Sequence, residues 1–211
     1  LDRGYGLDQG FAVYDQVGGR TGGGGLVEER RGARTIDVAL KWLGQVEGPY
    51  FLWVHLYAPP IPYDPPAAFR GRFQDALYAG EIAYVDREIG RLLAAVDARP
   101  QPLVKVLTSD HGEGLMEHGE ENHGVFVYDS CLRVPLLVVA PGVPAGQRAA
   151  GAVATVDIAP TLLELVGLPQ LQAAQGESLV PRLHGGPARE RSIYFENYGG
   201  YLGNGWSPLI G

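Results

Sequence analysis

Residues 103–124 constrain the fold of this chain more than any other segment. They begin with a short run of apolar β-formers that includes Val104 and Val106, and they change abruptly at Asp110 to a loop rich in His, Glu and Gly. A buried parallel strand that opens into a ligand site has this order, because ligands of open α/β sheets collect at the carboxyl ends of the strands. The segment therefore predicts a strand of an α/β sheet followed by a binding loop.

The loop after this strand has the residue types of a metal and anion site. Asp110 and His111 offer a carboxylate oxygen and an imidazole nitrogen, donors that divalent metals accept readily. His118 and His123 lie in the same loop, together with Gly112, Gly114, Gly119 and Gly124. An Asp-His pair can instead cap a helix, and an acidic loop can simply be solvated. The histidines and glycines taken together favour the metal and anion site.

The motifs of this region follow one another in a specific order. They are TSDHGE at 108–113, EHG at 117–119, HG at 123–124, YD at 128–129 and LRVPL at 132–136. In this order they resemble the carboxyl-terminal half of a sulfatase of the alkaline phosphatase superfamily. The resemblance implies hydrolysis of a sulfate ester, or of a related phosphate or phosphonate ester, at a divalent metal. It also implies a sheet with helices on both faces.

The resemblance implies roles for single residues. Asp110 and His111 correspond to metal ligands, and His118 corresponds to a position near the substrate. His123 stands where many sulfatases carry a lysine, so we expect an anion contact or general acid there, with metal ligation as the less favoured alternative. The family implies Ca²⁺, while the nitrogen donor of His111 also suits Mn²⁺ or Zn²⁺. An imidazole in place of that lysine predicts pH-dependent activity near neutrality.

Two features depart from the family pattern. The nucleophile motif, Cys or Ser followed by x-Pro-x-Arg, does not occur in these 211 residues. Pro60 and Ala58 stand where relatives usually carry His and Asp, and a proline can neither donate a proton nor bind a sulfuryl oxygen. We therefore expect residues 1–211 to be a partial sulfatase-like catalytic domain, truncated at the amino end, whose nucleophile-bearing half is absent and which has no turnover alone.

Hydrophobic periodicity predicts the secondary structure. Helices are expected at 35–45 with Thr35 as N-cap, at 75–96, and at 158–166 with Asp157 as a cap rather than a catalyst. Strands are expected at 50–56, 103–108, 134–140, 153–156 and 192–196, the first of them buried on both faces. The alternation of helices and strands predicts an α/β fold with a mainly parallel sheet.

Charge and cysteine content exclude some functions. The net charge is −7, from 17 basic and 24 acidic residues, and the basic residues form no stripe, so nucleic acid is not an expected partner. No apolar run approaches the roughly 20 residues that a membrane span needs. The single cysteine, Cys131, is expected to be a buried thiol rather than a nucleophile. The amino end has no signal-peptide pattern, and we expect residue 1 to lie inside a longer chain.

The favoured function is metal-dependent hydrolysis of a small-molecule or glycan sulfate ester. One alternative is a phosphodiester or phosphonate monoester hydrolase of the same superfamily, and the other is a non-catalytic fragment or degenerate sulfatase-like domain.

Overall fold

A computed structural model describes residues 3–16, 30–57, 61–199, 202, 205 and 209–210. The chain divides into two compact units, Leu1–Pro100 and Gln101–Gly211. Ala58 and Pro60, which depart from the family pattern, lie outside the described residues.

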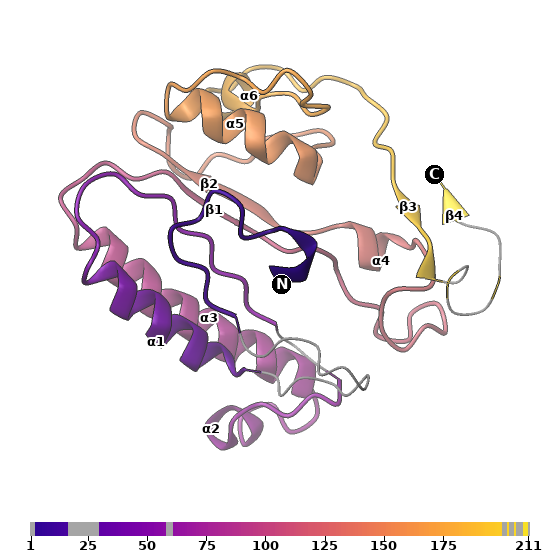
Figure 1. Ribbon diagram of the computed structural model, residues 1–211. Coiled ribbons are helices and arrows are strands. Elements are labelled where there is room, and N and C mark those ends of the chain that lie inside the picture. The colour runs from indigo at the N-terminus through magenta and orange to yellow at the C-terminus, as the bar shows by residue number, and fades with distance from the viewer. Residues whose placement is uncertain are drawn as a thin grey trace. The chain divides into compact units, whose positions relative to one another are not determined.

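The first unit is built on two packed helices. It contains η1 (Arg3–Tyr5), α1 (Gly32–Leu43), α2 (Ala67–Arg70) and α3 (Leu77–Asp97), and α1 runs along α3 (Figure 1). Ile36, Ala39 and Leu43 of α1 are buried, a spacing that places them on one helical face. Arg91 of α3 binds Asp37 of α1 at 2.6 Å. The predicted helices at 35–45 and 75–96 are therefore confirmed, with small shifts of their ends.

The start of α1 differs from the prediction. The N-cap residue is Arg31, which makes no side-chain cap bond, and Thr35 lies within the first turn, where it accepts a hydrogen bond from Arg30 Nε at 3.1 Å. The backbone N–H of Ala33 donates to the hydroxyl of Tyr84 at 2.8 Å. Because a distant tyrosine satisfies this free N–H, a cap from a neighbouring hydroxyl is not needed there.

The strand predicted at 50–56 is not present. These residues belong to no strand, and the side chains of Phe51 and Trp53 are 63% and 57% exposed. The prediction of a strand buried on both faces was therefore wrong. An apolar run indicates burial, but a strand also needs a hydrogen-bonded neighbour, and the described part of this unit provides none.

We expect Glu81→Gln to stabilise the chain at neutral pH. Glu81 is buried in α3, and its Oε1 accepts a hydrogen bond from the backbone N–H of Asp64 at 3.1 Å. Burial raises the pKa of this carboxyl above 4.5, although the charge of Arg31 opposes the change. The folded chain therefore holds this proton to a higher pH than the unfolded chain, and stability falls as pH rises between the two pKa values.

Glutamine keeps the acceptor and removes the charge. Urea unfolding should show Glu81→Gln more stable than wild type at about pH 7 and equally stable at about pH 3, where the glutamate is protonated in both states. A variant less stable than wild type at neutral pH would contradict this account.

The second unit contains an antiparallel strand pair. β1 (Lys105–Thr108) pairs with β2 (Leu136–Val139), and the register places Lys105 opposite Val139 and Thr108 opposite Leu136. The strands predicted at 103–108 and 134–140 are confirmed in position. The prediction of a mainly parallel sheet does not hold for this pair, which is antiparallel. A parallel pair needs a long crossover connection, and the only helix between β1 and β2 is the single turn α4 (Asp129–Leu132).

The remaining elements of this unit are short. η2 (Thr155–Asp157) leads into α5 (Ile158–Leu165), α6 (Val180–Leu183) follows, and β3 (Glu196–Asn197) pairs antiparallel with β4 (Leu209–Ile210). The predicted helix at 158–166 is confirmed, η2 replaces the strand predicted at 153–156, and only the last residue of 192–196 is in a strand. Across the described residues, no helix has the length and apolar character to cross a membrane.

Candidate functional site

The loop at 109–124 leaves the end of β1 and folds back against α4. The backbone N–H of Gly112 donates to the carbonyl of Cys131 at 2.8 Å, and that of Glu113 donates to the carbonyl of Ser130 at 3.0 Å. A Cβ on Gly112 would lie 2.0 Å from the Ser130 oxygen. Glycine at this position therefore lets the loop lie directly against α4.

Asp110 and His111 lie together at the start of the loop. Both side chains are exposed, and Asp110 Oδ1 is 3.9 Å from His111 Nε2. His111 Nδ1 is 2.7 Å from the carbonyl oxygen of Gly112. A carbonyl only accepts hydrogen bonds, so Nδ1 is the donor and carries the proton in the neutral ring. The lone pair of Nε2 is left beside the Asp110 carboxylate.

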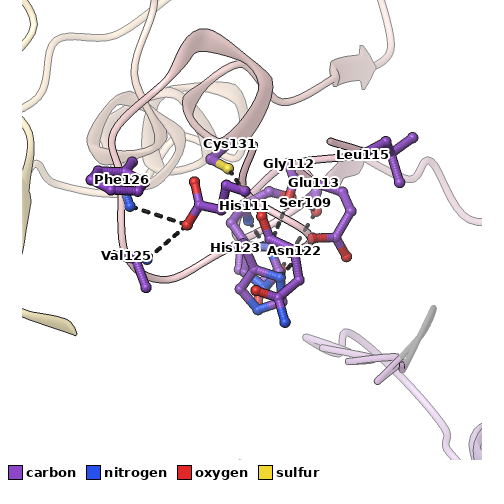
Figure 2. Close-up of polar contacts among 12 residues, drawn as sticks. Ser109, His111, Gly112, Glu113, Leu115, Asn122, His123, Val125, Phe126 and Cys131 are labelled. Carbon is purple, nitrogen blue, oxygen red and sulfur yellow. Dashed lines mark hydrogen bonds and ion pairs between the residues drawn. The ribbon is translucent and has the colours of Figure 1, made fainter. Parts of the chain in front are cut away.

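His123 comes back to the same place from the far end of the loop. Its ring stacks on the ring of His111, with centroids 3.7 Å apart (Figure 2). Its Nδ1 is 3.0 Å from Oε1 of Glu113, whose side chain is only 6% exposed. Sequence reasoning assigned no role to Glu113, because nothing in the spacing indicates that positions ten residues apart in a loop will meet.

His118 makes a different contact. Its ring stacks on Tyr128, with centroids 4.0 Å apart, and Tyr128 also contacts the ring of Phe126 at 5.6 Å. All three side chains are exposed. The structure therefore brings His111 and His123 into contact, whereas His118 belongs to an exposed aromatic group in the same unit.

A buried acid that the sequence did not single out shapes the end of the loop. Oε1 of Glu120 accepts hydrogen bonds from the backbone N–H groups of Val125 and Phe126 at 3.0 and 3.1 Å (Figure 2). Its Oε2 is buried and has no hydrogen-bond partner among the described residues. These two bonds close the turn that carries His123.

Cys131 is a buried free thiol, as predicted. Its Sγ lies 3.9 Å from the carbonyl oxygen of Asn122, and burial raises its pKa above 9.0. A thiol whose pKa is raised forms little thiolate at neutral pH, so it is a poor nucleophile.

The donors at this loop fit a divalent cation in type but not in number. Asp110 supplies oxygen, and the tautomer of His111 leaves a nitrogen free, which is the form that metals bind. Within the part of the chain that the structure describes, no group of three or more His, Cys, Asp or Glu side chains is arranged to hold a metal ion.

Sequence comparisons with known proteins point to one family. The sulfatase family model matches residues 12–168. Human (Homo sapiens) arylsulfatase K is 35% identical over 108 residues, which cover 50% of this chain and 20% of that protein. The chain thus spans about a fifth of the length of this relative.

Several solved structures are similar to the chain, and two of them are 30% or more identical to it over the matched residues. One, a complex with its substrate D-glucosamine-2-N,6-O-disulfate, has a TM-score of 0.53 and 30% identity, and the match covers 65% of this chain and 29% of that one. The other, a phosphonate monoester hydrolase from Silicibacter pomeroyi, has a TM-score of 0.51 and 32% identity, over 58% and 24% of the two chains. The fold is therefore of the alkaline phosphatase-like α/β type, and this chain belongs to the sulfatase family.

Proposed function

We propose that this chain forms part of a metal-dependent enzyme that hydrolyses sulfate esters of small molecules or glycans. One observation carries the proposal: the loop at 109–124 brings Asp110, His111 and His123 together in a chain of the sulfatase family. The disulfated glucosamine bound to a similar solved structure supports an amino sugar sulfate as the substrate class.

In this proposal Asp110 and His111 are two ligands of a divalent cation, with Ca²⁺, Mn²⁺ and Zn²⁺ as the candidates. Such a cation neutralises charge on the sulfuryl oxygens and lowers the pKa of a nucleophile when it is bound. The carbonyl of Gly112 holds the proton of His111 on Nδ1, which keeps Nε2 available. The remaining ligands and the nucleophile are not assigned to this chain, so residues 1–211 alone should not turn over substrate.

His123 and His118 have separate proposed roles. When both ring nitrogens of His123 carry protons, Nε2–H donates to a sulfuryl oxygen or gives its proton to the leaving oxygen, while Nδ1–H stays with Glu113. His118, stacked on Tyr128, lies near the alcohol part of the substrate, where flat exposed rings suit a sugar or aryl group.

Asp110→Ala tests the proposed metal site. We expect the protein made from its complete reading frame to lose about 100-fold or more in kcat/KM for 4-nitrophenyl sulfate, and to bind Mn²⁺ more weakly by calorimetry. Asp129→Ala is the matched control, because Asp129 is an exposed acid of the same unit whose only described ion pair, with Arg133, spans 3.9 Å. Equal activity and equal metal affinity of Asp110→Ala and wild type would refute the proposal.

A second candidate function is hydrolysis of phosphonate monoesters, which the likeness to the Silicibacter pomeroyi enzyme favours. An assay of the same protein on 4-nitrophenyl phenylphosphonate distinguishes the sulfatase function from the phosphonate hydrolase function. A higher kcat/KM for the phosphonate than for the sulfate would favour this second function, and no turnover of either by the complete protein would favour a non-catalytic domain.

A further inference from the structure

The Glu113 carboxylate is buried beneath an exposed imidazole. Its side chain is 6% exposed, that of His123 is 41% exposed, and Oε1 lies 3.0 Å from Nδ1. We propose that Glu113 is a positioning residue: it holds the neutral His123 ring as the Nδ1–H tautomer, so that Nε2 is the nitrogen presented to substrate. The catalytic meaning of this inference rests on the proposed function of His123.

The backbone on both sides of Glu113 is fixed by close packing. A Cβ on Gly112 would lie 2.0 Å from the carbonyl oxygen of Ser130, and one on Gly114 would lie 2.4 Å from the carbonyl oxygen of Asn122. The N–H of Glu113 donates to the same Ser130 oxygen at 3.0 Å. The packing fixes the backbone of Glu113, and the burial of its side chain, which is 6% exposed, restricts where the carboxylate can lie.

The segment that carries His123 is tied to the segment that carries Glu113. The N–H of Gly114 donates to the carbonyl of Asn122 at 3.2 Å, and these two residues are the chain neighbours of Glu113 and His123. Glu120 closes the turn on the other side, through the N–H groups of Val125 and Phe126. The carboxylate and the imidazole therefore meet as part of a hydrogen-bonded loop rather than as two free side chains.

The second restraint on His123 is its stacking on His111. The ring centroids are 3.7 Å apart and the ring planes make an angle of 28°. The Nδ1 of His111 is itself hydrogen-bonded to the carbonyl oxygen of Gly112 at 2.7 Å. Stacking fixes the face of the His123 ring, and Glu113 fixes which edge points inward. A carboxylate that accepts from one ring nitrogen sets the tautomer and leaves the other nitrogen free.

The inference is tested by the tautomer of His123, measured by long-range ¹H–¹⁵N correlation of the ¹⁵N-histidine-labelled 211-residue chain at about pH 8.5, where an ordinary imidazole is neutral. We expect the Nδ1–H form in wild type. Glu113→Ala removes the acceptor and should shift His123 toward the Nε2–H form that free histidine favours. Glu113→Gln keeps an oxygen that accepts from Nδ1 and should restore the Nδ1–H form.

Glu121→Ala is the control, because Glu121 is an exposed acid two residues from His123, and it should leave the tautomer unchanged. An Nε2–H form in wild type would overturn the inference even if Glu113→Ala does not fold, as would an unchanged Nδ1–H form in a folded Glu113→Ala.

In the protein made from its complete reading frame, Glu113→Ala should lower kcat/KM for 4-nitrophenyl sulfate by about 10- to 100-fold, and Glu113→Gln should recover most of the loss. Normal activity in a folded Glu113→Ala would overturn the positioning role. The expected tautomer in a complete protein that hydrolyses no sulfate would instead refute the proposed function alone.

Discussion

Replacing Asp157 with alanine should destabilise the Gln101–Gly211 unit by about 3 kcal/mol, because it breaks a buried ion pair and removes the acceptor of two backbone N–H groups. Asp157 is fully buried, at 0% exposure. Its Oδ2 lies 2.5 Å from Arg191, whose own side chain is 20% exposed and also pairs with Glu177 at 3.0 Å. Hydrogen bonding to Asp157 raises the pKa of Arg191 beyond its ordinary range, and a guanidinium that loses this partner is still charged at neutral pH.

Asp157 also satisfies two backbone groups. Oδ2 accepts from the N–H of Ala154 at 2.8 Å, and Oδ1 accepts from the N–H of Glu177 at 3.0 Å. One carboxylate therefore joins the start of α5 to two segments, one of them about twenty residues later in the chain. Alanine would leave both N–H groups without this acceptor, which adds to the cost of the broken ion pair.

Urea unfolding followed by circular dichroism measures the loss of stability. Hydrogen exchange of peptides from residues 152–191 should show which part of the unit is destabilised. The control is Asp129→Ala, which breaks the ion pair with Arg133 at 3.9 Å, where both side chains are more than 80% exposed. An exposed pair contributes about 0–1 kcal/mol. If Asp157→Ala costs no more than Asp129→Ala, the buried network does not stabilise this unit.

The same residue shows what sequence can and cannot predict. Its place before an apolar helix predicts a cap, and Asp157 does occupy the N-cap position of α5, yet it makes no side-chain bond to that helix. It binds Arg191 instead, 34 residues away, where no local pattern points. The position of Asp157 was predictable and its partners were not, because only tertiary packing brings them together.

For helices and strands, too, the positions could be predicted from the sequence, whereas the pairing of strands could not. α3 was predicted almost to its ends because its apolar residues repeat every 3.6 positions, and β1 and β2 were predicted because their apolar runs are short and β-branched. The direction in which β1 and β2 pair depends on the connection between them. Whether residues 50–56 form a strand depends on a neighbouring strand, which their own sequence cannot specify.

In the candidate site, too, local features could be predicted from the sequence and tertiary contacts could not. Asp110 and His111 are adjacent in the sequence, so their proximity needed no tertiary prediction. The stacking of His111 on His123, and the contact of His123 with Glu113, require the loop to close through backbone bonds to α4 and to Asn122. A glycine-rich sequence permits that closure but does not specify it.

Gly112→Ala should destabilise the second unit by about 3 kcal/mol, because a methyl group forced into a close-packed site must displace its surroundings. The new Cβ would meet the carbonyl oxygen of Ser130 at 2.0 Å and the Cα of Cys131 at 3.3 Å. These are backbone atoms of α4 and cannot rotate away as a side-chain end can. The bond from Gly112 N–H to Cys131 holds the two segments at this distance, and we expect it to be lost.

Gly90→Ala is the matched control for the same substitution. Gly90 lies inside α3, and a Cβ there would have nothing within 4 Å, so alanine should stabilise the chain by up to about 1 kcal/mol through its higher helix propensity. Opposite signs in urea unfolding would show that the cost at Gly112 comes from contact with α4 rather than from the loss of a glycine. Because the displaced loop carries His111 and Glu113, Gly112→Ala should also lose the wild-type tautomer of His123, and a variant with both stability and tautomer unchanged would show that the loop does not need this contact.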